Sequence, residues 1–195
     1  PDSLSQRIDD TFNFAKTPEG GGSGGSGLGA GFEKYFQGKA SVISQYDPRV
    51  AKKVLPGGGT VADEGCAPIA ASIATGMDPN EAIRSVRNDD RPENGAGVTG
   101  KYFGHLNKGF KYDDANSDGS DLMTHSGIVG GVSPYGGPFT PNGHYLATKG
   151  GYEQNGRKYI RTVDPITGEQ KDYDYAVLQA GVNMPNSPRV IGTFT

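Results

Sequence analysis

The sequence predicts an α+β domain in which N-terminal helices pack on an antiparallel β-sheet. Small and apolar runs with helix start and stop signals fill the first half of the globular part, and β-branched and aromatic runs separated by Gly, Pro and Asn fill the second. Helices followed by strands are typical of the α+β class. At 195 residues the chain accommodates one domain with a core and is too short for two of full size.

Composition divides the chain into three parts. In residues 1–19, apolar side chains recur at every fourth position behind Ser3, which predicts a short amphipathic helix. Residues 20–31 contain eight glycines in twelve positions, a composition typical of a flexible linker. The globular pattern begins near residue 40, so we expect one domain over residues 40–195.

Three helices and then four strands are expected in that domain. Residues 64–76 are small and apolar on every side, which predicts a buried helix with Cys66 at its beginning. Shorter helices are expected over residues 78–87 and 99–108. The predicted strands are residues 127–133, 144–148, 158–164 and 189–194.

Charge, hydropathy and cysteine content exclude several classes of function. A net charge of −3 and a pI near 5.6 argue against nucleic acid and anionic membranes as partners. The mean hydropathy is −0.57, no apolar run is long enough to span a membrane, and the first residues lack a signal-peptide pattern. The start at Pro1 leads us to expect a larger parent chain. A single cysteine excludes a disulfide framework and a multi-cysteine zinc site, and we expect no metal and no cofactor.

The one thiol, Cys66, is placed where a nucleophile is favoured. Backbone N–H groups and the positive end of the helix dipole stabilise a thiolate at a helix N-terminus. The base is expected to be an imidazole, and the candidates are His105, His125 and His144. His144 begins a predicted strand, whereas His105 lies in a predicted helix and His125 follows an acidic loop, so we prefer His144. The alternative for Cys66 is an inert buried side chain.

Asp164 is the carboxylate expected to orient the imidazole. If the second and third predicted strands pair as a hairpin, His144 and Asp164 lie near the same end of the sheet. The carboxylate then accepts the second ring N–H and fixes the tautomer. The structural alternatives are a strand-end histidine that is hydrogen-bonded for stability and an Asp-Pro turn.

Four short motifs occur in the order found in one peptidase family. They are Gln45-Tyr46-Asp47-Pro48-Arg49, Gly65-Cys66-Ala67-Pro68, Gly143-His144-Tyr145 and Val163-Asp164-Pro165. Over residues 40 to about 180 the chain resembles the papain-fold cysteine peptidases related to the double-glycine leader peptidases of bacteriocin exporters. The resemblance implies a papain-like fold, with the nucleophile helix packed on the sheet, and hydrolysis of peptide bonds.

The resemblance also implies the roles of four residues. Cys66 is the nucleophile and His144 the general base, and Asp164 orients the imidazole of His144. Gln45 donates its side-chain amide to the oxyanion together with the backbone N–H of Cys66. The alternative for Gln45 is a surface residue without a role.

Two departures from the family pattern leave the function open. The family usually has an aromatic residue where this chain has Val50, and Gly where it has Ala67, which we expect to narrow the approach to the thiol.

The leading hypothesis is a cysteine peptidase acting on a peptide or protein substrate, including a protein of its own virion or secretion system. Gly-rich sequences such as the chain's own linker, residues 20–31, are candidate substrates. The alternatives are a peptidoglycan amide hydrolase with the same site and a catalytically silent binding or structural module.

The resemblance implies a setting outside the cytoplasm. Related domains occur in secreted bacterial proteins and in phage tail proteins, so we expect an extracellular or virion-associated protein.

Two loops carry weaker signals. Residues 114–119 match the first half of a calcium loop, but His125 stands where a bidentate Glu is needed, so a solvated Asx-rich loop is preferred. Residues 134–143 precede His144, and their aromatic side chains are expected either to flank the cleft as a substrate-binding lip or to belong to an ordinary hairpin loop.

Overall fold

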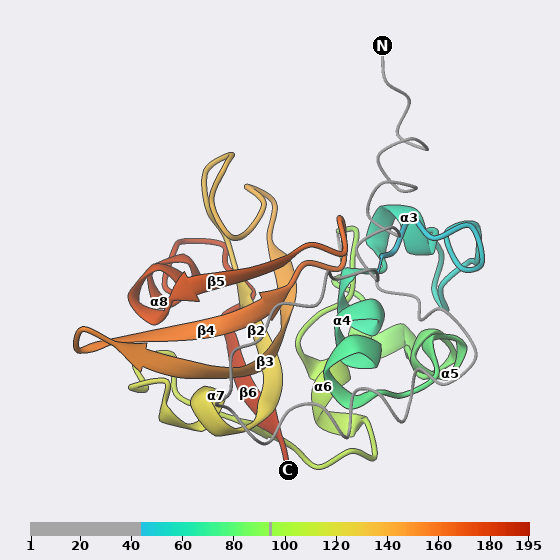
Figure 1. The fold of residues 1–195 in the computed structure, drawn as a ribbon. Helices are drawn as coiled ribbons and strands as arrows, with labels where there is room; N and C mark the ends of the chain where they lie inside the picture. The colour runs from blue at the N-terminus through green and yellow to red at the C-terminus, as the bar shows by residue number, and fades with distance from the viewer. Residues whose placement is uncertain (1–43, 94) are drawn as a thin grey trace, which may run out of the picture. The chain divides into compact units, whose positions relative to one another are not determined.

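The computed structural model describes residues 44–93 and 95–195. They belong to the second of the two units into which the chain divides, Pro1–Tyr35 and Phe36–Thr195. The predicted N-terminal helix and the Gly-rich linker lie outside the described residues. The described part is an α+β structure, in which helices from its first half pack on a six-stranded antiparallel sheet (Figure 1).

The elements follow the predicted order. The helices are α3 (Val61–Glu64), α4 (Cys66–Thr75), α5 (Pro79–Arg84), a 3-10 helix (Asn88–Asp90), α6 (Lys101–His105), α7 (Ser120–Thr124) and α8 (Tyr175–Val182). The strands are β1 (Phe110–Tyr112), β2 (Ser126–Gly131), β3 (His144–Gln154), β4 (Arg157–Val163), β5 (Gln170–Asp174) and β6 (Val190–Phe194). The three expected helices are α4, α5 and α6, the last two shorter than predicted. The four expected strands are β2, β3, β4 and β6, and the remaining elements are additional.

Helix α5 ends before the predicted boundary at residue 87 because a new turn begins there. The Asp90 carboxylate accepts the Arg87 N–H at 2.7 Å and caps the 3-10 helix. The start of α5 follows the sequence signals, since Asp78 accepts the N–H groups of Asn80 and Glu81.

The sheet has the strand order β1-β6-β2-β3-β4-β5, and every neighbouring pair is antiparallel. Strands β3 and β4 form the predicted hairpin, with Ala147 opposite Val163. Strand β3 runs past its predicted end because the register shifts between Thr148 and Gly151, where Gly150 has a φ of +76°.

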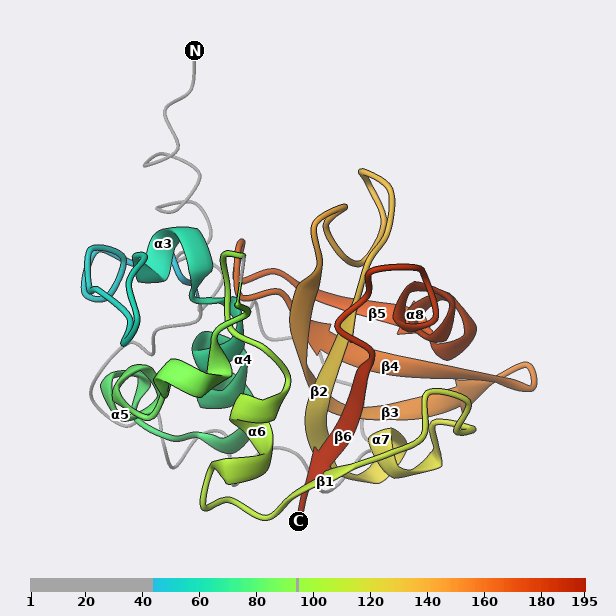
Figure 2. The same cartoon turned by 180° about the vertical axis from the view of Figure 1, so that it is seen from behind.

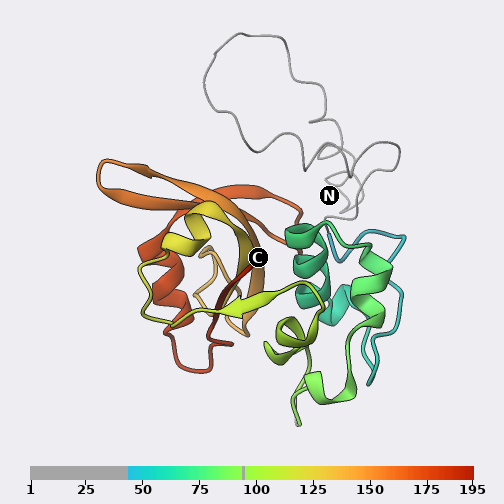
Figure 3. The ribbon, with the colours of Figure 1, turned by 90° about the horizontal axis from the view of Figure 1, so that it is seen from below.

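Alternation along the strands directs side chains into two separate cores. Ile128 and Tyr145 belong to the core shared with α4, α5 and α6, whereas their neighbours Val129 and Leu146 belong to the core under α7 and α8. Figures 2 and 3 show these two groups of helices on opposite sides of the sheet. Both faces of the sheet are therefore covered, and α4 is held against β2 and β3.

Candidate active site

Helix α4 places Cys66 at the edge of the core that the sheet shares with α4, α5 and α6. Eight of its residues are buried, in one run from Ala67 to Ala74. The helix ends at Gly76, whose φ is +72° and whose N–H bonds the Ser72 carbonyl. Cys66, at the other end, is only partly buried. Apolar packing thus fixes the helix and leaves the sulfur partly accessible at its N-terminus.

His144 is the first residue of β3 and is almost fully buried, at 2% exposure. It follows Gly143, which has a φ of +93° that side-chain-bearing residues rarely adopt. The ring Nε2 lies 2.8 Å from Oδ1 of Asp164, directly after β4. The same oxygen accepts the Ile166 N–H at 2.7 Å. The hairpin thus brings together the two residues that the sequence places at one end of the sheet.

The imidazole of His144 also forms a side-chain hydrogen bond with Cys66. Because Nε2 faces Asp164, Nδ1 is the ring nitrogen left for the sulfur. Burial opposes protonation of the ring, but hydrogen bonds and charge interactions with Asp164 and Cys66 outweigh it and raise the pKa of His144 from 6.5 to about 9. The ring is therefore an imidazolium at neutral pH, with a sulfur on one side and a carboxylate on the other.

Gln45 is buried at 4% exposure, so its alternative as a surface residue is wrong. Its Nε2 donates to the Ala62 carbonyl at 2.6 Å, four residues before the thiol. Its backbone N–H donates to the Pro165 carbonyl at 2.7 Å. An amide nitrogen carries two hydrogens, of which the Ala62 carbonyl takes one. Gln45 therefore lies between the segment that leads into α4 and the turn that follows Asp164.

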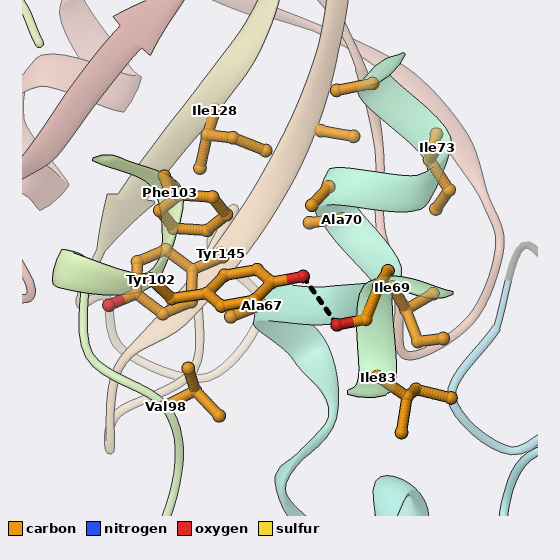
Figure 4. Packing of buried hydrophobic residues seen from close by; sticks show 14 of the residues in the cluster. Ala67, Ile69, Ala70, Ile73, Ile83, Val98, Tyr102, Phe103, Ile128 and Tyr145 are labelled. Atoms are coloured by element: carbon orange, nitrogen blue, oxygen red, sulfur yellow. Dashed lines mark hydrogen bonds between the residues drawn. The ribbon is translucent and has the colours of Figure 1, made fainter. Parts of the chain in front are cut away.

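Ala67 and Val50 are core residues rather than cleft residues. They are 0% and 1% exposed, and both belong to the core under α4. Figure 4 shows Ala67 among the aromatic side chains of that core, beside Tyr102 and Tyr145. The expectation that Ala67 narrows the approach to the thiol is wrong, because the second residue of α4 faces the sheet.

The other two histidines have different partners. His105, at the end of α6, has its Nε2 3.2 Å from Oδ2 of Asp90 and 3.2 Å from the Ser85 carbonyl. His125 bonds within its own turn, with Nδ1 2.9 Å from the Thr124 hydroxyl. Neither interaction involves the thiol, whereas that of His144 does.

A lysine binds the loop that resembles half a calcium site. The Lys158 ammonium donates to the Asp118 carbonyl at 2.8 Å, to its carboxylate at 2.9 Å and to the Ser120 hydroxyl at 2.8 Å. Gln179 and Tyr175 of α8 donate to the Ser117 carbonyl. Within residues 44–93 and 95–195, no group of three or more His, Cys, Asp or Glu is placed to hold a metal ion. The loop's oxygen atoms thus already have cationic and polar partners.

The loop before His144 has one exposed and one buried aromatic residue. Tyr135 is 93% exposed. Phe139 is 4% exposed and packs in the core under α8, so the expectation that it flanks the cleft is wrong. The Ser133 hydroxyl holds the loop closed, because it accepts the Phe139 N–H and donates to the Phe139 carbonyl.

Three partners in this site are absent from the sequence prediction. They are the Ala62 carbonyl, the Ile166 N–H and the Ser44 hydroxyl, which donates to the Ile166 carbonyl at 2.6 Å. Two of them are backbone groups, so no residue type marks them. The only available signal is their nearness in sequence to Cys66, Asp164 and Gln45.

Comparison with family models, with curated proteins and with solved structures gives no match to this chain. Among the described residues, no helix has both the length and the apolar character needed to cross a membrane.

Proposed function

We propose that this chain is a cysteine peptidase with a papain-like fold that hydrolyses peptide bonds. The observation that carries the proposal is the hydrogen-bonded series from Cys66 through the buried His144 ring to Asp164. A sulfur beside an imidazolium is the arrangement in which a thiolate acts as nucleophile near neutral pH. The four ordered motifs add support, since they resemble those of the double-glycine leader peptidase group.

The reaction begins with attack of the Cys66 thiolate on the substrate carbonyl carbon. The negative charge that develops on the carbonyl oxygen is bound by the Cys66 backbone N–H and by the second amide hydrogen of Gln45. The Nδ1 proton of His144 passes to the leaving amine, the C–N bond breaks, and a thioester remains. Water then attacks the thioester, giving its proton to His144, and release of the acid restores the thiolate.

Asp164 contributes by fixing the ring of His144. Its bond to Nε2 keeps that nitrogen protonated, so Nδ1 is the atom that exchanges a proton with sulfur and substrate. The Ile166 N–H holds the same carboxylate oxygen and limits its rotation. Asp164 therefore acts on orientation and charge, without touching the substrate.

The test is peptide hydrolysis by the full chain. We expect cleavage of a diverse peptide library, detected by mass spectrometry, and complete loss of cleavage in Cys66→Ala. Thr124→Ala, which removes an exposed hydroxyl at the last residue of α7, serves as the matched control and retains activity. A thiol-reactive probe should label Cys66 in the wild type at pH 6 as well as at pH 8, because the imidazolium persists to about pH 9.

Substrate class is tested in the same preparation. The resemblance supports a peptide or protein substrate in an extracellular or virion-associated setting, and Gly-rich peptides belong in the library. Cleavage of purified peptidoglycan, with no cleavage of peptides, would show an amide hydrolase of a different polymer. Absence of both activities, with no labelling of Cys66, would identify a catalytically silent module.

A further inference from the structure

We infer that Ser44 is a positioning residue that fastens Gln45 to the turn carrying Asp164. The inference rests on the proposed function, in which Gln45 binds the oxyanion. Ser44 belongs to none of the roles that the family resemblance implies.

Two parallel connections join the segment at Ser44 to the turn after β4. The Ser44 hydroxyl donates to the Ile166 carbonyl at 2.6 Å, and the Gln45 N–H donates to the Pro165 carbonyl at 2.7 Å. The Ser44 oxygen also accepts the Tyr46 N–H at 3.1 Å. The hydroxyl therefore bonds both its own segment and the turn after β4. These bonds span about 120 residues of sequence, as the separation of 122 between Ser44 and Ile166 shows.

The same turn holds the imidazole in place. Asp164 accepts both the His144 Nε2–H and the Ile166 N–H through one carboxylate oxygen. The turn thus has the ring of His144 on one side and the Gln45 segment on the other. Its Ile166 residue uses its N–H for Asp164 and its carbonyl for Ser44.

This arrangement fixes Gln45 relative to the nucleophile from two directions. The side chain is attached to the Ala62 carbonyl, close in sequence to Cys66, and the backbone is attached to the Pro165 carbonyl. An oxyanion donor must be placed to within about 0.5 Å to be effective, so a loosened backbone weakens it. Removal of the Ser44 hydroxyl leaves the Ile166 carbonyl without this donor and frees the segment.

The experiment compares Ser44→Ala with Ser44→Thr, which keeps the hydroxyl. Ser85→Ala is the matched control, because Ser85 likewise donates its hydroxyl to a backbone carbonyl, that of Glu81, at the C-terminal end of α5. Hydrolysis kinetics, alkylation of Cys66 by iodoacetamide between pH 5 and 9, and hydrogen exchange of the Gln45 backbone N–H are measured for each protein.

We expect Ser44→Ala to lower kcat by about 5- to 10-fold, the effect of one lost hydrogen bond, with little change in KM. Exchange of the Gln45 N–H should accelerate by a similar factor, and Ser44→Thr should restore both values. The pH profile of alkylation should stay unchanged, because alkylation needs the Cys66–His144 pair and no oxyanion donor. Ser85→Ala should match the wild type.

Three results would overturn the inference: wild-type kcat in Ser44→Ala, unchanged exchange of the Gln45 N–H, or no rescue by Ser44→Thr. Failure of the proposed function looks different. If the wild type hydrolyses nothing, the peptidase proposal fails, while the exchange rate of Gln45 still reports whether Ser44 holds that segment.

Discussion

Two histidine–aspartate pairs occur among the described residues, and they differ in what surrounds them. His144 and Asp164 join β3 to the end of β4, with Nε2 2.8 Å from Oδ1. His105 and Asp90 join α6 to the 3-10 helix, with Nε2 3.2 Å from Oδ2. In the first pair the ring is buried and the acid is partly exposed, whereas in the second the acid is buried, at 1%, and the ring is more open. Only the first pair bonds a thiol, Cys66.

The His105–Asp90 pair has partners that stabilise helices, whereas the His144–Asp164 pair is the one that the proposed mechanism uses. The Asp90 carboxylate accepts the Arg87 N–H that begins the 3-10 helix, and His105 lies edge-on to the Tyr102 ring. Both partners of that pair are thus used to hold helices together. An imidazole beside a carboxylate is therefore insufficient to predict catalysis, and the proposal for His144 rests on the thiol of Cys66 next to its ring.

Replacing each histidine by asparagine gives the largest expected contrast. His144→Asn removes the group that we propose to transfer the proton, so kcat should fall by about 100- to 10,000-fold. His105→Asn should leave kcat within about twofold, since the partners of His105 are Asp90 and the Ser85 carbonyl rather than the thiol. It should lower the free energy of unfolding by about 1–3 kcal/mol through weaker pairing of buried Asp90. Hydrolysis kinetics and thermal unfolding measure the two effects. Equal loss of activity in both variants would contradict the assignment of different roles to His144 and His105.

Replacement of Gln45, a buried residue next to the His144–Asp164 pair, gives the next largest expected effect. Gln45→Ala should reduce kcat by about 100- to 1,000-fold, the usual effect of removing one oxyanion donor. Alkylation of Cys66 should keep its wild-type pH profile, because the thiol and His144 remain in contact. Parallel kinetics and alkylation measurements check this. An altered alkylation profile would show that Gln45 supports the Cys66–His144 pair rather than the oxyanion.

The smallest expected effect is on pH dependence. The imidazolium of His144 loses its proton near pH 9, so kcat/KM should decline above that pH. Asp164 is one cause of the raised pKa, and Asp164→Asn should therefore move this decline to lower pH, by about 1 pH unit. Asp90→Asn should leave the decline in place. A full pH–rate profile of the three proteins measures the shift, and an unmoved decline in Asp164→Asn would contradict the assignment.

Sequence patterns predict the long, self-contained elements well. The run of small apolar residues after Cys66 forms α4, and alternate residues of the strands are buried in the two cores. Both patterns are local, so α4, β2, β3, β4 and β6 follow from the sequence. The short edge strands β1 and β5 do not follow, because a three- or five-residue strand with mostly exposed residues is specified by its neighbour. The burial of Ala67 and Phe139 does not follow from local patterns either, because it depends on how the segments that carry them pack against the rest of the fold.

The amino-acid sequence specifies the chemical groups: one thiol, three imidazoles, and an aspartate twenty residues after the preferred histidine. Which of these groups come into contact depends on the fold. Pairing of β3 with β4 places Asp164 against the ring of His144, and packing of α4 on the sheet places Cys66 on its other side. Hydrogen bonds and charge interactions act over a few ångströms. The sequence therefore fixes which side chains are present, but the fold sets the distances between them.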